Sequence, residues 1–265
     1  MLLKTEYDKP VEIADGIYWV GYNTESIFRC NPYLIVDGDE AVLIDPGSSV
    51  DFFAVRSKVA SIISLDKIKH IILHHQDPDL CGSARQFEVL IGKDRLKVYN
   101  PLRSSFFTRF YGIETPITNI SEDDQSITLA SGRKIKFLMT PYCHSPGAMI
   151  TFDEKTKFLF TSDIFGAFNE EWDLFADKVS REKHEESVRL FMEPFMGSDD
   201  AMQQAISKME NLEVNSICPQ HGSIIRKDMK GWLKKAKEFK YGGYLRKNMK
   251  DEYMHVAWAM GIDIK

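Results

Sequence analysis

Hydrophobic and polar residues alternate along the first part of the chain, and this alternation predicts short strands. Residues 17–20, 33–36 and 41–44 follow it, and the last two segments are separated by the turn sequence Asp37-Gly38-Asp39. From residue 51 to residue 63 the apolar positions recur near a helical period, and a short apolar segment follows at 70–73. The pattern therefore predicts a β meander that leads into a helix and a further strand.

The rest of the chain alternates predicted strands and helices. Residues 82–91 are predicted to be helical, residues 96–99 form a strand, and residues 126–140 form a hairpin that turns at Ser131-Gly132. Residues 149–152 and 157–161 flank the predicted turn at residues 153–156 and form a second hairpin. Residues 185–191, 199–212 and 228–239 have the single apolar face of surface helices. The stretch 166–181 lacks a regular period, and its aromatic residues make it a candidate lid or interface.

The composition fits one globular domain. The chain has 265 residues, of which 43% are hydrophobic and 28% charged, so it can bury a sizeable core. We find no linker rich in Gly, Ser or Pro and no internal repeat. The sequence therefore predicts a single α/β domain over residues 1–265, built from two layered sheets with outer helices.

Charge and cysteine usage narrow the function classes. The net charge of -5 offers no basic surface for nucleic acid, and the apolar runs are far shorter than the about 20 residues that a membrane span needs. Four cysteines, Cys30, Cys81, Cys143 and Cys218, lie far apart with no C-x-x-C pair, so neither a disulfide framework nor a Cys-rich zinc site is predicted. We expect a cytoplasmic protein that binds neither nucleic acid nor membrane.

The densest polar cluster follows the predicted strand at 70–73. In His74-His75-Gln76-Asp77-Pro78-Asp79, the side chains of His75, Asp77 and Asp79 are two residues apart. An extended or turn backbone can aim all three at one centre, at a strand end where α/β proteins place their sites. A solvated turn whose acids cap the next helix explains the cluster equally well.

Three more predicted strands end in ligand-type residues. His144 follows the strand that ends the first hairpin, Asp163 follows residues 158–160, and His221 follows residues 216–218. Each residue alone is as well explained by a buried histidine or a helix cap. Together with the cluster, however, they make three histidines and three aspartates, which predict a two-metal site with one carboxylate bridging ions about 3.5–4 Å apart.

These motifs resemble the metallo-β-lactamase superfamily, in which H-x-[HED]-x-D, His, Asp and His occur in this order. Asp45, in Leu43-Ile44-Asp45-Pro46-Gly47, resembles the early aspartate of that superfamily. The resemblance implies a four-layer αβ/βα sandwich. Within the superfamily the chain looks most like the diiron domain of flavodiiron proteins, because position 77 is a carboxylate and the segments around Asp163 and His221 match.

The resemblance also implies a ligand set. One iron ion is expected to be held by His75, Asp77 and His144, and the other by Asp79 and His221, with the carboxylate of residue 163 as the bridge. Carboxylate in place of imidazole makes the site harder and more negative, which favours iron, with zinc or manganese as the alternative metals.

Two positions depart from the flavodiiron pattern. Asp77 stands where these proteins have Glu, which shortens the reach by one methylene. Leu80 stands where they have a histidine that binds the second iron, so we expect that ion to have an open position or a substitute ligand. His74 should point away from His75 and support the site or pack in the core.

Flavodiiron proteins continue into a flavodoxin domain that supplies electrons, and we find no phosphate loop of flavodoxin type. The resemblance therefore implies a diiron protein that binds and activates O2, either as an oxygen sensor in signalling such as bacterial chemotaxis or as an O2 or NO reductase with a separate electron donor. The expected partners are O2 or another diatomic ligand, a redox or signalling protein, and a second copy in a homodimer. The alternatives are a dinuclear zinc hydrolase of esters, thioesters or phosphodiesters, and a metal-free interaction module.

Overall fold

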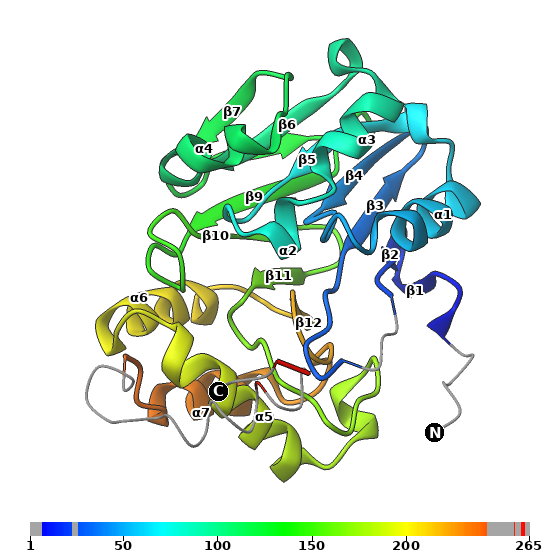
Figure 1. The fold of residues 1–265 in the computed structure, drawn as a ribbon. Helices are drawn as coiled ribbons and strands as arrows, with labels where there is room; N and C mark the ends of the chain where they lie inside the picture. Colours follow the sequence, from blue (N-terminus) through cyan, green and yellow to red (C-terminus); the bar gives the residue numbers. More distant parts are fainter. Residues whose placement is uncertain (1–6, 23–25, 243–256, 258–260, 263–265) are drawn as a thin grey trace.

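The computed structural model describes residues 7–22, 26–242, 257 and 261–262, and two sheets form its centre (Figure 1). The first sheet has the order β1-β2-β3-β4-β5-β6-β7, and the second has the order β12-β11-β10-β9-β8. The strands of the first sheet are β1 (Val11–Ala14), β2 (Ile17–Trp19), β3 (Tyr33–Asp37), β4 (Glu40–Ile44), β5 (Ile68–Ile72), β6 (Lys97–Pro101) and β7 (Ile117–Ile120). Those of the second are β8 (Ser126–Thr128), β9 (Lys134–Met139), β10 (Met149–Asp153), β11 (Phe158–Ser162) and β12 (Ser216–Pro219).

Helices lie outside both sheets. They are α1 (Phe52–Ile62), α2 (Pro78–Cys81), α3 (Ala84–Ile91), α4 (Leu102–Thr108), α5 (Arg181–Phe195), α6 (Asp199–Glu210) and α7 (Met229–Glu238), with short 3-10 turns at Leu65–Lys67, Lys93–Arg95, Arg109–Tyr111 and Ala176–Lys178. Figure 1 shows α1 and α3 beside the first sheet, and α5, α6 and α7 on the opposite side of the molecule. Among the described residues, no helix combines the length and the apolar character that a membrane crossing requires.

The period-two alternation of the strands produces the layers. In β4, Val42 and Ile44 point into the cluster between the sheets, whereas Leu43 packs against α1 and α3 on the other face. In the second sheet, Phe160 of β11 faces the same central cluster and Leu159 faces α5, α6 and α7. Three apolar layers therefore separate helix, sheet, sheet and helix, and the predicted four-layer αβ/βα sandwich is confirmed.

The predicted elements differ from the observed ones where the apolar period is weak. The helix predicted at residues 185–191 runs over the longer α5, because the Ser180 side chain accepts a hydrogen bond from the Lys183 N–H and starts it earlier. Neither α4 nor β7 was predicted, since α4 exposes Phe106 and Phe107 and the four residues of β7 include two that are exposed.

The irregular stretch 166–181 forms no long element, and its aromatic rings pack inward. Phe168 is buried in the cluster with α5, and Trp172 and Phe175 pack against the cluster between the sheets. Core packing therefore accounts for these rings.

Candidate metal centre

His74 and His75 follow β5 and point in different directions. The His74 backbone N–H donates to Asp45 Oδ1 (2.9 Å), and its ring nitrogens lie 2.5 Å from Asp45 Oδ2 and 3.0 Å from Thr151 Oγ1. Both ring nitrogens are thus occupied in a fully buried setting, which confirms that His74 packs in the core. Asp45, the early aspartate of the motif, is the hydrogen-bond partner of His74.

His75 keeps one nitrogen for a ligand. Its Nδ1 lies 3.1 Å from the Ser162 hydroxyl, which fixes the ring. Its Nε2 is buried and makes no hydrogen bond to any described residue. A buried nitrogen without a partner is costly unless something else binds it. The nearest carboxylate oxygens are Asp163 Oδ2 at 3.4 Å and Asp77 Oδ2 at 3.6 Å.

The first group of possible ligands consists of His75, Asp77 and His144. One donor atom from each lies within 4.8 Å of the other two. His144 Nε2 lies 3.2 Å from Asp77 Oδ2 and 2.8 Å from Asp163 Oδ2. The side chains of Asp77 and His144 are 31% and 22% exposed, whereas that of His75 is fully buried, so this group is reached from one side.

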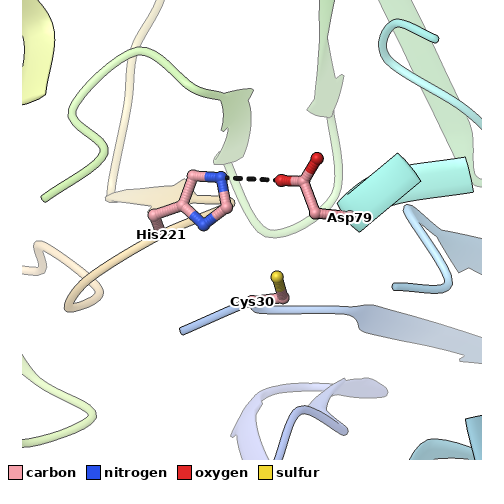
Figure 2. A group of neighbouring side chains, drawn as sticks. All are labelled: Cys30, Asp79 and His221. Carbon is pink, nitrogen blue, oxygen red and sulfur yellow. Dashed lines mark ion pairs between the residues drawn. The ribbon is translucent and has the colours of Figure 1, made fainter. Parts of the chain in front are cut away.

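The second group consists of Cys30, Asp79 and His221, again with donor atoms within 4.8 Å of one another. Figure 2 shows the Cys30 thiol pointing toward the other two side chains. His221 Nε2 lies 3.1 Å from Asp79 Oδ2, and its Nδ1 lies 2.9 Å from the Arg29 carbonyl oxygen, to which it donates. Burial raises the pKa of the Cys30 thiol, and the neighbouring His221 partly offsets this.

Asp163 lies between the two groups. Its Oδ2 faces His144 and His75, and its Oδ1 lies 3.4 Å from His221 Nε2 and makes no hydrogen bond to any described residue. The residue before it, Ser162, has a φ of 52°, which is uncommon for a residue with a side chain and is typical of strained functional turns. One buried carboxylate therefore presents an oxygen to each group.

The charges of the cluster are strongly coupled. Burial opposes the charge on His144, but the hydrogen bonds that its ring donates to the carboxylates of Asp163 and Asp77 outweigh burial and raise its pKa to about 10. The pKa of His221 is raised well above its usual value for the same reason. Burial alone favours protonated Asp163, yet the imidazoles hold the pKa of this carboxyl well below its usual range. Carboxylates that stay ionised while buried are suited to bind cations.

The structure brings together all six residues that the sequence analysis predicted as metal ligands, namely His75, Asp77, Asp79, His144, Asp163 and His221. Their nitrogen and oxygen atoms, with two buried donor atoms lacking hydrogen bonds, fit a pair of metal ions. Their role as ligands stays a prediction.

Cys30 was not predicted from the sequence as a member of the site. It follows no predicted strand and belongs to no motif, and it reaches the centre through a backbone bridge to His221 that the sequence does not reveal. Leu80 has a hydrocarbon side chain that offers no donor atom to a metal. It is fully buried in the apolar cluster that includes Phe52 and Phe87.

A four-layer sandwich with two adjoining groups of ligand-type side chains is the architecture of a metallo-β-lactamase-like metal-binding domain. The profile described as ODP family beta lactamase matches residues 28–222, a range that contains both groups. The chain belongs to this family.

Solved structures and curated proteins agree with this assignment. The apo state of the chemotaxis sensor ODP from T. denticola is 27% identical, with a TM-score of 0.78, and the match covers 91% of this chain and 97% of that one. The Type A flavoprotein fprA of Rhodobacter capsulatus is 29% identical over 84% of this chain and 54% of its own length. A nitric oxide reductase of Moorella thermoacetica is 25% identical over 83% and 58%. The chain thus spans little more than half the length of these two curated relatives, and its resemblance to flavodiiron proteins is confirmed.

Proposed function

We propose that the chain is a non-haem diiron protein that binds and activates O2 or a related diatomic molecule such as NO. The observation that carries this proposal is the position of Asp163, whose two oxygens face two separate groups of possible ligands. A shared carboxylate is what a two-metal site requires. The related proteins include the chemotaxis sensor ODP in a peroxy diiron species and a nitric oxide reductase, and these relatives support iron and a diatomic ligand.

The candidate ligands form two groups, and each group is proposed to bind one ion. The first ion is proposed to be held by His75, Asp77 and His144, and the second by Asp79 and His221. The carboxylate of Asp163 is proposed to bridge the two ions. Iron held there supplies the electrons for binding a diatomic molecule. The imidazoles of His75 and His221 are oriented by Ser162 and by the Arg29 carbonyl, so that each aims Nε2 at the centre.

The partly exposed side chains mark the side from which a small ligand enters. Asp77, Asp79 and His144 are 31%, 24% and 22% exposed, whereas the side chain of Asp163 is buried. A hollow of about 510 Å³ lies beside Asp77 and is lined by Phe107, Phe110 and Tyr111. A small neutral molecule can reach Asp77 from this hollow.

Within this class we favour an oxygen sensor over a reductase. The family model that matches residues 28–222 is that of the ODP family, and the T. denticola chemotaxis sensor ODP is 27% identical with a TM-score of 0.78. We propose that residues 1–265 form a single domain that works in the cytoplasm as a homodimer with a signalling or redox partner. As a reductase it requires a source of electrons for repeated turnover.

Anaerobic reconstitution with Fe(II) tests the proposal. We expect about two iron ions per chain, as a two-metal site requires, and a change in near-ultraviolet and visible absorption when O2 is admitted. Repeated O2 consumption when a reductant is supplied contradicts the sensor role. Native protein that contains only zinc, together with an iron-loaded form that does not respond to O2, overturns the diiron assignment and favours the zinc hydrolase.

A further inference from the structure

We propose that Cys30 is a ligand of the second metal ion and takes the place of the histidine that Leu80 replaces. The inference rests on the proposed two-metal function and completes it, because Asp79 and His221 alone give the second ion few protein donors. The sulfur of Cys30 adds a third donor, and Oδ1 of Asp163, 3.4 Å from His221 Nε2, is a possible fourth.

The backbone fixes the thiol beside the imidazole. Cys30 and His221 form an antiparallel β-bridge, and the next residue, Asn31, donates its N–H to the Gln220 carbonyl at 2.7 Å. The Asn31 side-chain amide also donates to the carbonyls of Pro219 (3.0 Å) and Gly222 (3.1 Å). The backbone around Cys30 is thus held on both sides of His221, which places the Cys30 side chain next to the imidazole.

The same segment also orients the imidazole. His221 Nδ1 donates to the Arg29 carbonyl, and the ring of Phe28 stacks on the imidazole with a centroid separation of 4.0 Å. Phe28 thus packs on the ring, and the Arg29 carbonyl binds its Nδ1. Cys30, the next residue, carries the neighbouring sulfur. One donor atom each of His221, Cys30 and Asp79 lies within 4.8 Å of the other two, and Figure 2 shows the Cys30 thiol pointing toward the other two side chains.

Cys30 differs from the other three cysteines, which have ordinary structural roles. Cys81 is fully buried and donates its S–H to the His75 carbonyl at 2.9 Å. Cys143 packs in the cluster with α5, and Cys218 packs between the sheets. Among the described residues, the apolar clusters include these three and not Cys30, which is only half-buried. Free cysteines are usually small buried hydrophobes, and Cys30 does not fit that description.

The thiol binds a metal by losing its proton to solvent as the bond between sulfur and metal forms. A thiolate is a softer donor than the nitrogen and oxygen atoms of the first group. The two ions therefore have different donor atoms. A sulfur neighbour is expected only for the ion in the second position.

X-ray absorption of the full chain loaded with zinc tests this assignment. We expect two zinc ions per chain and a sulfur neighbour at about 2.3 Å. Cobalt loading should give a thiolate-to-cobalt charge-transfer band in the near ultraviolet. Cys30→Ala should remove both signals and weaken binding of the second ion by more than about tenfold. Cys218→Ala, which removes a buried sulfur three residues before His221, should keep both.

The outcomes separate this inference from the proposed function. Two bound ions without a sulfur neighbour overturn the role of Cys30 and leave the two-metal centre intact. A wild-type chain that binds fewer than two ions overturns both. A sulfur signal that survives in Cys30→Ala and disappears in Cys218→Ala overturns the inference as well. If Cys30→Ala does not fold, Cys30→Ser preserves the size of the side chain and is expected to lose the charge-transfer band.

Discussion

The two halves of the candidate metal centre are built in different ways. In the first, His75 and His144 follow strands β5 and β9, and Asp77 stands at the start of α2. The second combines Asp79 inside α2 and His221 after β12 with Cys30, which comes from the opposite end of the chain. The first half offers only nitrogen and oxygen atoms, whereas the second adds a sulfur.

This difference shows how a lost ligand can be replaced without changing the fold. The first half follows the flavodiiron pattern apart from the shorter carboxylate of Asp77. The second half lacks the histidine at position 80, and a side chain far away in the sequence occupies the neighbourhood of the ion. The backbone bridge between Cys30 and His221 makes the replacement possible, because it brings the two residues together whatever their side chains are.

The largest expected effect is the loss of both ions on removing the carboxylate that the halves share. Asp163→Ala should reduce bound iron from about two ions per chain to almost none, because each half loses an oxygen donor. Metal analysis after gel filtration measures this. Asp163→Asn, which keeps the size and removes the charge, should fall between the two. An Asp163→Ala protein that keeps two ions contradicts the bridging role.

Removing one imidazole should separate the halves. His221→Ala should leave about one ion per chain, held by the first group, and His75→Ala should leave about one ion held by the second. Both should lose the spectrum of the dinuclear centre. His74→Ala is the matched control, since His74 is bound to Asp45 and Thr151 instead. It should keep both ions and lose about 1–3 kcal/mol of stability, because the buried Oδ2 of Asp45 loses the imidazole as its partner. Metal loss in His74→Ala alone would show that the two neighbouring histidines are exchanged in our assignment.

Much of this centre could be predicted from the sequence because its ligands stand at strand ends. Apolar alternation locates the strands, and parallel strands such as β11 and β12 bring Asp163 and His221 to one edge. The spacing of the cluster at residues 74–79 identified His75 and separated it from His74, since consecutive residues of an extended chain face opposite ways.

The sequence could not reveal contacts that depend on tertiary pairing. Cys30 lies in a segment without a strand pattern, and its neighbour across the bridge is His221. The helix α4 was missed because its exposed aromatic residues hide the helical period. The local alternation of apolar and polar residues indicates which face of an element is buried. It does not indicate which distant segment covers that face.

The support behind the second half should weaken in acid. His184 is buried in α5, and its Nδ1 lies 3.1 Å from the Asn169 side-chain amide, while the Asn169 carbonyl accepts from Arg29. Burial, with help from Arg181, lowers the pKa of His184 to about 4. The unfolded chain has an ordinary histidine pKa of about 6.5. Between these values the unfolded state binds more protons, so stability is present above about pH 6.5 and is lost as the pH falls toward 4.

Urea unfolding of the metal-free protein at several pH values measures this effect. The wild type should lose as much as about 3 kcal/mol more than His184→Gln over that range. Glutamine keeps a polar group next to Asn169 and does not titrate. Equal slopes for the two proteins would show that His184 is not held neutral by the fold.

The smallest expected effect comes from restoring the histidine at position 80. If Cys30 already binds the second ion, Leu80→His should change the affinity of that ion little, since the place of the missing ligand is filled. In the Cys30→Ala background the same substitution should tighten binding of the second ion, because the imidazole then has a vacant position to occupy. The four proteins form a double-mutant cycle, in which independent residues add within about 0.3–0.5 kcal/mol and coupled ones do not. Leu80 lies in an apolar cluster, so Leu80→His also costs stability and Leu80→Ala serves as the control for lost packing. Equal gains from Leu80→His in both backgrounds would mean that the thiol and the imidazole do not compete for one ion, and that the two halves of the centre are less different than their donor atoms indicate.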